Sequence, residues 1–479
     1  MSSPVRFFHY KNALHLCFAI ILLIIYICPA QESRRLGEPR GTMSDSSPLQ
    51  NNGHRGARRP KKASNAVLPE RTRVKFSLEK GAAKIVSAVS NYCKTKQNNT
   101  NFVISPLAIQ AAILIRHPAI DLDDGEYKFL EYLGYDLRLA SSALIKGTQS
   151  QVSSLSSHPS FALGFIYIYN WLTPINDRLR DIFDEYYEMD YDVQEPNATQ
   201  GIYSFAELYK RVNAWAAGKT KNNIPQLLTG IDISNFTYDY LITLGHFQGD
   251  WVWMFKLEKT QSSTFYNDGN SSTVQNVPFL SGRESFRYLD SREPDYNVPP
   301  HSIPTGKKHR STPLYPNCDC HMVALPFTDR RFTMMLLIPG QLNGLHKLQT
   351  IPVAMLKQFM KESKPQTIDL KVPKFSIYNV LRLEDIFQEH GMRTIFKNKF
   401  HSGLGTYRRP FVETKLIHGN TFSINEQGAN VNGAHSYKKH YLSNPIVFRN
   451  ITIDRPFMFV VMDIINYVPL IVGQVTRAA

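Results

Sequence analysis

The segment that decides the fold is FSINEQGANVNGAHSYKKHYLSNP, residues 422–445. It opens like a β-strand, because Phe422 and Ile424 alternate with other residues and so lie on one face. After Gly428 it continues as a long run of small and polar residues, close to the C-terminus. Such a run is most often a solvated loop between strands. The rest of the chain indicates a more particular use for it.

The composition is that of a folded protein with a basic surface. The 479 residues include 43% hydrophobic residues, which is enough for a large core, and the formal net charge is +15. This charge favours acidic partners such as a glycosaminoglycan, a phospholipid surface or a nucleic acid, and it does not choose among them. A chain of this length holds roughly three domains or one large fold.

Residues 1–30 have the layout of a secretory signal peptide. Arg6 and Lys11 precede an apolar run that ends near Cys28, and Ala30 offers a small residue for cleavage. The apolar run is slightly long, so an uncleaved signal anchor is the alternative. No later segment reaches about 18 uninterrupted apolar residues, so we expect no membrane span after removal of the signal.

Residues 31–73 form a basic tail that is poor in large apolar side chains. We expect the tail to be disordered, because it cannot bury enough surface to offset its ordering entropy. Its paired basic residues are suited to a polyanion or to a convertase, and a solvated tail without a partner is an equal alternative. Residues 74–479 form the folded domain, within which residues 292–317 are rich in proline and basic residues and predict a surface insertion.

Helical patterns dominate the first half of this domain and strand patterns the second. Apolar residues recur in steps of three and four from Phe205 to Trp215, which predicts a helix. Apolar runs that predict buried strands occupy residues 332–338, 456–463 and 468–475. In 368–372 apolar and polar residues alternate, and the pattern shifts at Pro373 as a β-bulge would require. We therefore predict an α+β domain with large sheets.

The cysteines do not predict a disulfide scaffold, whereas the glycosylation sequons, together with the signal peptide, are typical of a secreted glycoprotein. Loss of the signal peptide leaves Cys93, Cys318 and Cys320, so at most one disulfide forms within the chain. The Cys-Asp-Cys-His run at 318–321 could be read as metal ligands, but its spacing falls short of a zinc pattern and we expect no metal. Asn-x-Ser/Thr sequons occur at Asn98, Asn197, Asn235, Asn270 and Asn450.

The chain carries no complete catalytic signature. It lacks a GxSxG elbow, an HExxH helix, a P-loop and a full dinucleotide fingerprint, since Gly403-Leu404-Gly405 is a lone GxG. His418 lies in a strand-like stretch, where a histidine is more often a satisfied structural residue than a catalyst. We expect neither enzymatic activity nor a cofactor.

Several segments, taken in order, resemble the serpin family. The segment NFVISPLAIQAAIL (101–114) resembles the start of a serpin helix, and FQGDWVWMF (247–255) resembles the serpin strand that ends in a glycine and a tryptophan. Further similar segments are 323–340, 368–377, 424–434, 454–463 and 469–475. The resemblance implies a serpin fold with three β-sheets, about nine helices and an exposed reactive-centre loop, which the quoted segment would form.

The resemblance also implies a mechanism. In inhibitory serpins a serine protease cleaves the exposed loop and forms an acyl-enzyme, and the freed loop then inserts as a new strand in the central sheet and distorts the protease. The hinge of that loop would consist of Glu426, Gly428, Ala429, Val431 and Gly433. In the inserted strand, alternation directs the last three inward with His435, and it directs Asn430 and Asn432 outward. A buried unpaired His435 imidazole would cost about 1 to 3 kcal/mol.

Residues beneath the insertion path match the family only in part. Ser105 and His418 match the family's shutter, and Trp251 matches its breach. Ala108 stands where a second serine is usual, and Thr243 stands where an asparagine is usual. From these two departures we expect an incomplete hydrogen-bond network.

The count from Glu426 predicts a scissile bond at Leu442–Ser443. A leucine there is suited to a chymotrypsin-like or elastase-like protease. A shift of register to Tyr441 gives a similar answer, whereas Lys439 would indicate a trypsin-like enzyme.

The hypothesis is a secreted, extracellular, monomeric serpin that inhibits a serine protease and binds no nucleic acid. The alternative is a non-inhibitory serpin-fold carrier, polyanion-binding protein or decoy.

Overall fold

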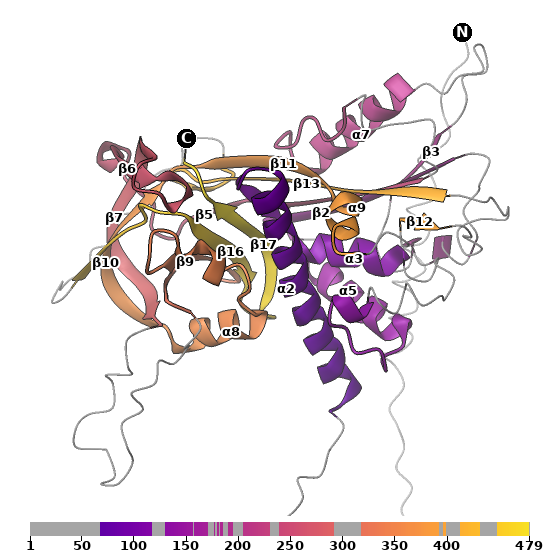
Figure 1. Ribbon diagram of the computed structural model, residues 1–479, viewed down its shortest axis with the longest axis horizontal. Helices are drawn as coiled ribbons and strands as arrows, with labels where there is room; N and C mark the ends of the chain where they lie inside the picture. The colour runs from indigo at the N-terminus through magenta and orange to yellow at the C-terminus, as the bar shows by residue number, and fades with distance from the viewer. Residues whose placement is uncertain are drawn as a thin grey trace, which may run out of the picture. The chain divides into compact units, whose positions relative to one another are not determined.

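Four of the six described α-helices lie in the first half of the chain and most of the strands follow them, as predicted (Figure 1). The computed structural model describes residues 68–116, 130–156, 158–170, 177, 180, 181, 183, 184, 190–194, 205–229, 239–291, 318–391, 396–398, 412–431 and 448–478. Its α-helices are α2 (Glu70–Lys96), α3 (Pro106–Arg116), α5 (Ser141–Ser156), α7 (Phe205–Lys219), α8 (Val353–Glu362) and α9 (Leu383–Gln388). The predicted signal peptide, the tail up to residue 67 and the insertion 292–317 lie outside the described residues.

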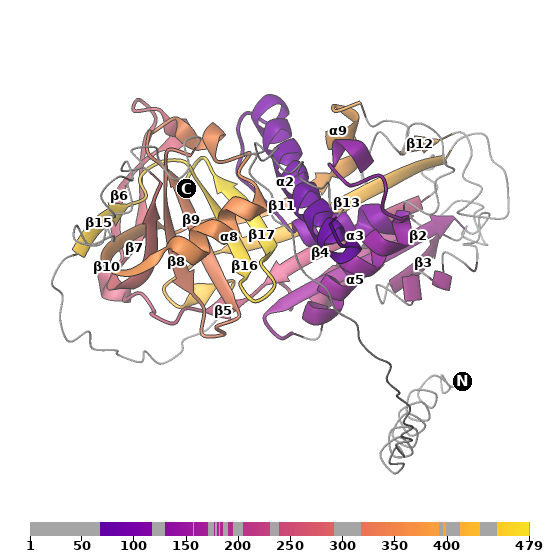
Figure 2. The ribbon, with the colours of Figure 1, turned by 90° about the horizontal axis from the view of Figure 1, so that it is seen from below.

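A mixed six-stranded sheet positions the candidate site. Its strands pair in the order β11 (Ser376–Arg382), β13 (Val412–Ser423), β4 (Asp239–Phe247), β2 (Phe161–Asn170) and β3 (Asp190–Gln194), and β12 (Lys397–Asn398) pairs with β13. At its centre β13 and β4 are parallel neighbours, and His418 lies opposite Thr243. Helix α7 covers one face of this sheet, whereas α3 and α5 cover the other (Figures 1 and 2). Every residue of β4 is therefore buried.

A nine-stranded sheet makes up most of the C-terminal half. Its order is β1 (Phe102–Ile104), β17 (Val468–Val475), β16 (Phe457–Asp463), β9 (Phe332–Pro339), β8 (Cys320–Pro326), β7 (Val274–Asp290), β10 (Lys364–Pro373) and β15 (Phe448–Thr452), and β6 (Gln261–Tyr266) pairs with β7. A third sheet has two short strands, β5 (Gly249–Asp250) and β14 (Gly428–Ala429). The prediction of three sheets is confirmed, and the total of about nine helices stays a prediction.

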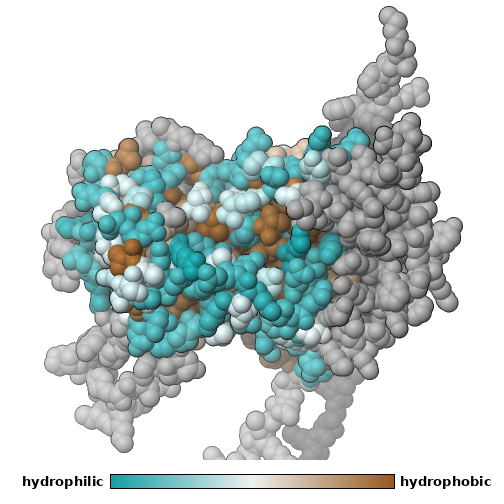
Figure 3. Space-filling model, turned by 45° about the horizontal axis from the view of Figure 1, so that its top comes forward, coloured by the Kyte–Doolittle hydropathy of each residue, from teal (hydrophilic) through white to brown (hydrophobic). Residues whose placement is uncertain are grey.

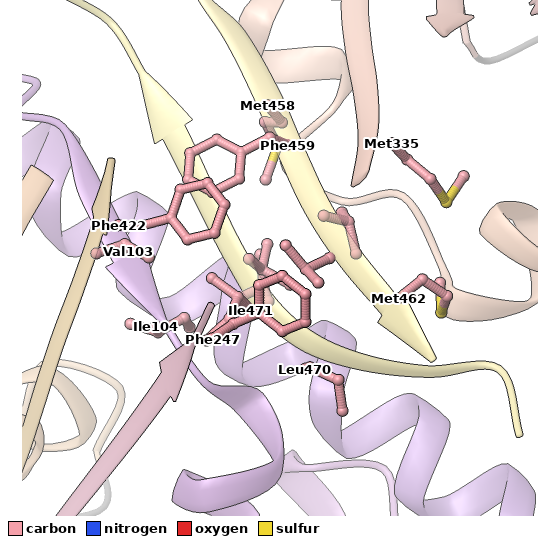
Figure 4. Packing of buried hydrophobic residues seen from close by; sticks show 14 of the residues in the cluster. Val103, Ile104, Phe247, Met335, Phe422, Met458, Phe459, Met462, Leu470 and Ile471 are labelled. Carbon is pink, nitrogen blue, oxygen red and sulfur yellow. The ribbon is translucent and has the colours of Figure 1, made fainter. Parts of the chain in front are cut away.

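The core lies between the six-stranded sheet and strands β16 and β17. Figure 4 shows the ring of Phe422, from β13, against the ring of Phe459, from β16. Their centroids are 4.8 Å apart, and Phe375 packs on Phe459 at 5.2 Å. Burial of each such side chain contributes about 2 to 3 kcal/mol. This packing fixes the end of β13, from which the quoted segment leaves.

The predicted bulge at Pro373 is wrong, although the strands on both sides of it are present. Pro373 is the last residue of β10, and Ser376 begins β11 in the other sheet. The apolar pattern shifts because the chain passes from one sheet to another, not because one strand bends. A proline favours the end of a strand, since it has no backbone N–H to donate to the ladder. Its successor Lys374 donates its backbone N–H to the carbonyl of Pro278.

Of the three cysteines in the described residues, Cys318 and Cys320 form a disulfide, and Cys93 is buried with a free thiol. The metal-ligand alternative at 318–321 is therefore wrong, because these two sulfurs bond to each other. The bond closes the short run that begins just after the predicted insertion. This outcome agrees with the expectation of at most one disulfide within the chain.

The face drawn in Figure 3 is mostly hydrophilic, and its hydrophobic residues form small, separate patches. Large exposed hydrophobic side chains include Leu257, Val274 and Ile465. Isolated residues of this kind are normal on a protein surface. Within the described ranges, no helix is long and apolar enough to cross a membrane.

Candidate functional site

The chain leaves β13 at Ser423 and turns back on itself at once. The backbone N–H of Asn425 donates to the carbonyl of Gly428 (3.0 Å). The Oδ1 atom of Asn425 accepts the backbone N–H groups of Gln427 (2.9 Å) and Gly428 (3.0 Å). An asparagine side chain that bonds the backbone two and three residues on stabilises a tight turn. The sequence Asn-Glu-Gln-Gly therefore directs the hinge back toward the sheet.

After this turn, β14 begins a new antiparallel strand between two existing ones. Gly428 lies opposite Asp250 and Ala429 lies opposite Gly249, on the short strand that continues β4. Ala429 also forms a bridge with Ile424, at the end of β13. The first two residues after the turn thus lie in the gap between the ends of β4 and β13.

Only glycine fits at position 428. A Cβ atom on Gly428 would lie 2.1 Å from the carbonyl oxygen of Gly249, which is a contact with backbone that cannot yield easily. Ala429, which follows, is fully buried, and Val431 is also buried. Gly433 and His435, the other residues expected to face inward in the inserted strand, lie outside the described residues, so the inward face of that strand stays a prediction.

Glu426 anchors the turn. Its carboxylate accepts a hydrogen bond from the Thr260 hydroxyl (2.8 Å) and pairs with the Lys374 ammonium, which is 3.1 Å from both carboxylate oxygens. Burial by itself raises the pKa of Glu426, but the bonds from its own backbone N–H, Thr260 and Lys374 outweigh burial and lower the pKa. The backbone carbonyl of Glu426 accepts the N–H of Phe255 (2.9 Å). The carboxylate is therefore held ionised at the base of the hinge.

Trp251 supports the same turn from below. Its indole N–H donates to the carbonyl of Asn425 (3.0 Å), and its backbone N–H donates to the carbonyl of Gln427 (2.8 Å). The indole stacks on Phe327 with a centroid distance of 4.6 Å. The structure thus places the tryptophan that was expected at the breach in direct contact with the hinge.

His418 is fully hydrogen-bonded beneath the gap. Its Nε2 accepts the backbone N–H of Ser105 (3.0 Å), so Nδ1 carries the proton and donates to the Thr243 hydroxyl oxygen (2.8 Å). Burial lowers the pKa of His418 to about 3, so the imidazole is neutral. The expected gap in the network is therefore not at His418, because the threonine hydroxyl supplies the acceptor that an asparagine was expected to supply.

The gap in the network lies two residues further along β13, at Asn420. This side chain is fully buried opposite Gly245, and neither its oxygen nor its nitrogen has a partner among the described residues. Ser105 caps α3, since its Oγ accepts the N–H of Ala108 (3.4 Å). Ala108 itself has no polar side chain to offer. The hydrogen bonds around the His418 ring are thus complete, whereas the polar atoms of the Asn420 side chain remain unpaired among the described residues.

Sequence reasoning missed the role of Asn430. It was expected to point outward, but it is only 4% exposed and lies in the gap between β4 and β13. The available signal was the pair Asn425 and Asn430 around a glycine, because asparagine tolerates the backbone angles of turns and bonds nearby backbone groups.

The other predicted residues are placed as follows. The bond Leu442–Ser443 and the alternatives Lys439 and Tyr441 lie outside the described residues, as do Asn197 and Asn235. The three described sequon asparagines, Asn98, Asn270 and Asn450, are exposed. At Asn270 the Oδ1 atom accepts both the N–H and the hydroxyl of Ser272.

Comparison with protein-family models matches the chain to "Serpin (serine protease inhibitor)" over residues 84–299 and 302–478. A serine protease inhibitor of Cyanea capillata is 23% identical over 56% of this chain and 65% of its own length. A corticosteroid-binding globulin of Pongo abelii is 23% identical over 57% of this chain and 60% of its own length. The chain therefore matches less than two thirds of either protein.

Solved structures are similar in fold. Human thyroxine-binding globulin has a TM-score of 0.67 at 18% identity, covering 85% of this chain and 100% of that chain. A cleaved serpin, Serpin 42Da, has a TM-score of 0.67 at 16% identity, with the same coverage. These low identities show the fold alone.

Proposed function

The chain belongs to the serpin family, and on this premise we propose that it inhibits a serine endopeptidase by cleavage and insertion of the loop that follows β14. The chain itself supplies no catalysis in this proposal. The protease attacks the loop, and the fold then traps the acyl-enzyme before water hydrolyses it. The proposal makes the gap between β4 and β13 the functional site.

The observation that carries the proposal is the position of β14. Its two residues already pair in antiparallel sense at the open end of two parallel neighbours, β4 and β13. A strand that continues from β14 would separate those neighbours and pair with both. About a dozen new ladder bonds at about 1 kcal/mol net each would stabilise the inserted state.

The buried side chains of the hinge support the same direction of movement. Ala429 and Val431 are buried without charge, so the inward face of the strand begins with groups that carry no desolvation penalty. Val431, which is bulkier than the alanine usual in the family, is accommodated in this arrangement. Unlike the hinge, the scissile bond is proposed from the sequence alone, at Leu442–Ser443.

The target is proposed to have chymotrypsin-like or elastase-like specificity, because a leucine side chain fits an apolar pocket. A non-inhibitory carrier is the second candidate. It is favoured by the similarity to proteins named corticosteroid-binding and thyroxine-binding globulins. Because the carrier and the inhibitor would share one fold, a functional assay must separate them.

The assay is incubation with chymotrypsin-like, elastase-like and trypsin-like proteases, followed by denaturing electrophoresis. The inhibitor is expected to form a covalent complex that survives detergent, and Leu442→Ala is expected to form less of it with the first two classes. Lys439→Ala is the matched control, because it changes a nearby side chain and leaves the leucine in place. Cleavage without a complex, for all three classes, would contradict inhibition of those classes and favour the carrier.

We propose secretion into the extracellular space on separate grounds. The signal-like residues 1–30, the Cys318–Cys320 disulfide and the exposed sequon asparagines are typical of that compartment. The basic tail before residue 74 further favours binding to a glycosaminoglycan or another polyanion.

A further inference from the structure

The side chain of Asn430 joins the two central strands at the point where they separate. Its Nδ2 donates to the carbonyl of Phe247 in β4 (2.8 Å) and to the carbonyl of Thr421 in β13 (3.1 Å). Its Oδ1 accepts the backbone N–H of Ser423 (2.8 Å) and the Ser423 hydroxyl (3.1 Å). One buried carboxamide thus satisfies three backbone groups from two strands.

These backbone groups are the ones that an inserting strand would use. Below this level β4 and β13 pair directly, up to Asn420 opposite Gly245. Above it, β14 lies between them. A carboxamide has the same donor and acceptor as a peptide group. The Asn430 side chain therefore takes the place of the next peptide unit of the inserted strand.

The backbone of Asn430 also ends the strand. Its φ is +51°, in the left-handed region, where a β-strand cannot continue. Asparagine tolerates this region better than most residues. Its own N–H donates to the carbonyl of Ser423 (2.9 Å), and the carbonyl of the next residue, Val431, accepts Nδ2 of Asn425 (2.8 Å). Further insertion requires residue 430 to become extended and its carboxamide to leave.

The start of the strand does not depend on the Asn430 carboxamide. The pairing of β14 with β5 consists of backbone groups. The turn before it is held by Glu426 with Lys374 and Thr260, and by the two bonds of Trp251 to the backbone. Removal of the carboxamide therefore leaves the first two residues in the gap and frees the groups beyond them.

We propose that Asn430 is a positioning residue that arrests the loop after two inserted residues, and that it thereby sets the rate at which the cleaved loop enters the six-stranded sheet. The inference rests on the proposed function, because it concerns the insertion step. It adds that the arrest lies in one side chain of the hinge. A slower insertion favours hydrolysis of the acyl-enzyme, so Asn430 would also set the ratio of cleaved inhibitor to trapped protease.

The test compares Asn430→Gly with Asn430→Ala in the full chain. Both substitutions remove the carboxamide, but glycine adopts the left-handed backbone without strain, whereas alanine does not. Asn276→Gly, at an exposed asparagine of β7, is the control for a general effect of the substitution. Thermal unfolding and circular dichroism establish that each variant is folded before it is compared.

Three measurements follow, and none of them needs a target protease. Hydrogen exchange of the intact protein reports the Ser423 amide, whose N–H is bonded to the Asn430 side chain. Cleavage of the loop by thermolysin, a metalloprotease that forms no acyl-enzyme, then starts insertion. The intrinsic tryptophan fluorescence, to which Trp251 contributes from its contact with the hinge, reports the rate of insertion. A gain in the thermal stability of the cleaved protein shows that insertion of the loop is complete.

In Asn430→Gly we expect exchange of the Ser423 amide and the insertion rate each to rise about tenfold, which corresponds to about 1.4 kcal/mol. Asn276→Gly is expected to behave like the unsubstituted protein. Wild-type rates in Asn430→Gly would overturn the inference and reduce Asn430 to a turn residue.

The outcome for the proposed function is separate. If the cleaved unsubstituted protein gains no stability but cleaved Asn430→Gly does, the arrest is supported and inhibition by the natural chain is contradicted. If neither gains stability, the loop does not insert and the inference is overturned as well. If both gain stability but no protease forms a complex, the arrest is judged on the two rates and the inhibitor proposal fails alone.

Discussion

Two buried histidines lie on opposite faces of the six-stranded sheet, and their surroundings differ. His418 faces α3, and both of its ring nitrogens are hydrogen-bonded. His246, in β4, faces the side covered by α7, because it alternates with Thr243, which faces the other way. It is only 4% exposed, and neither of its ring nitrogens has a partner among the described residues.

The difference shows that burial alone does not give a polar side chain a structural role. Burial lowers the pKa of both rings, to about 3 for His418 and about 4 for His246, where Lys221 adds to the effect. Only the His418 ring offsets the loss of water with hydrogen bonds to the described residues. An unpaired buried polar group costs about 1 to 3 kcal/mol. His418 therefore holds strand β13 to α3 and β4, whereas His246 weakens the sheet beside the insertion gap.

The largest expected effect comes from His246→Leu at low pH. Leucine has a similar volume and no polar atom, so we expect the variant to be more stable than the unsubstituted protein by about 2 kcal/mol at pH 7.5. The gain should grow to about 5 kcal/mol at pH 4.5. Urea unfolding of both proteins at each pH measures the difference directly, and groups shared by both proteins cancel in it.

The sign of this pH dependence follows from linkage. His246 has a folded pKa of about 4, below its ordinary value of 6.5. The unfolded chain therefore binds the proton first as the pH falls, and the unsubstituted protein loses stability through the window from 6.5 to about 4, by up to about 1.4 kcal/mol per pH unit. Leucine has no such loss. A constant difference between pH 7.5 and 4.5 would mean that His246 is protonated in the folded protein.

Substitution of His418, whose ring is hydrogen-bonded, is expected to lower the stability instead. His418→Ala should lower the free energy of unfolding by about 4 kcal/mol, because it leaves a cavity and removes the partners of the Ser105 N–H and the Thr243 hydroxyl. His246→Ala is the matched control. It creates a cavity of the same kind, and it leaves no group among the described residues without its hydrogen-bond partner. Equal losses in the two alanine variants would show that packing, not hydrogen bonding, separates the two sites.

The sequence could predict the architecture but not these environments. Apolar runs such as 332–338 predicted buried strands because burial on both faces requires them. The fate of a polar side chain depends on the neighbouring strand, which the chain supplies from far away. Thr243 satisfies His418 across 175 positions of sequence. Asn430 was expected to point outward because a uniform strand was assumed, whereas the left-handed backbone at that residue ends the alternation.

Thr243→Val tests the hydrogen bond of the His418 ring, and its expected effect on the free energy of unfolding is smaller. Valine keeps the shape of threonine and removes the acceptor of the His418 Nδ1–H bond. The other tautomer of His418 cannot restore the lost bond, because a proton on Nε2 would point at the Ser105 N–H. We expect a loss of about 2 kcal/mol in the free energy of unfolding. Thr243→Ser keeps the hydroxyl and should lose less than half of that, and an equal loss in both would assign the effect to packing.

The smallest expected effect extends the comparison to the charged pair at the hinge. Glu426 and Lys374 keep side-chain exposures of 14% and 32%, so solvent screens their attraction more than it screens the contacts of either buried histidine. Glu426→Gln keeps the acceptor for Thr260 and removes the charge, and we expect a loss of about 1 kcal/mol at low salt. Because the pKa of Glu426 is lowered, this stability is present above its ordinary pKa and is lost as the pH falls through the folded value. Addition of 0.5 M salt should remove about half of the difference, since the pair is partly in water. If the difference in urea unfolding does not depend on salt, the Glu426–Lys374 pair is shielded from water, as the contacts of His418 are.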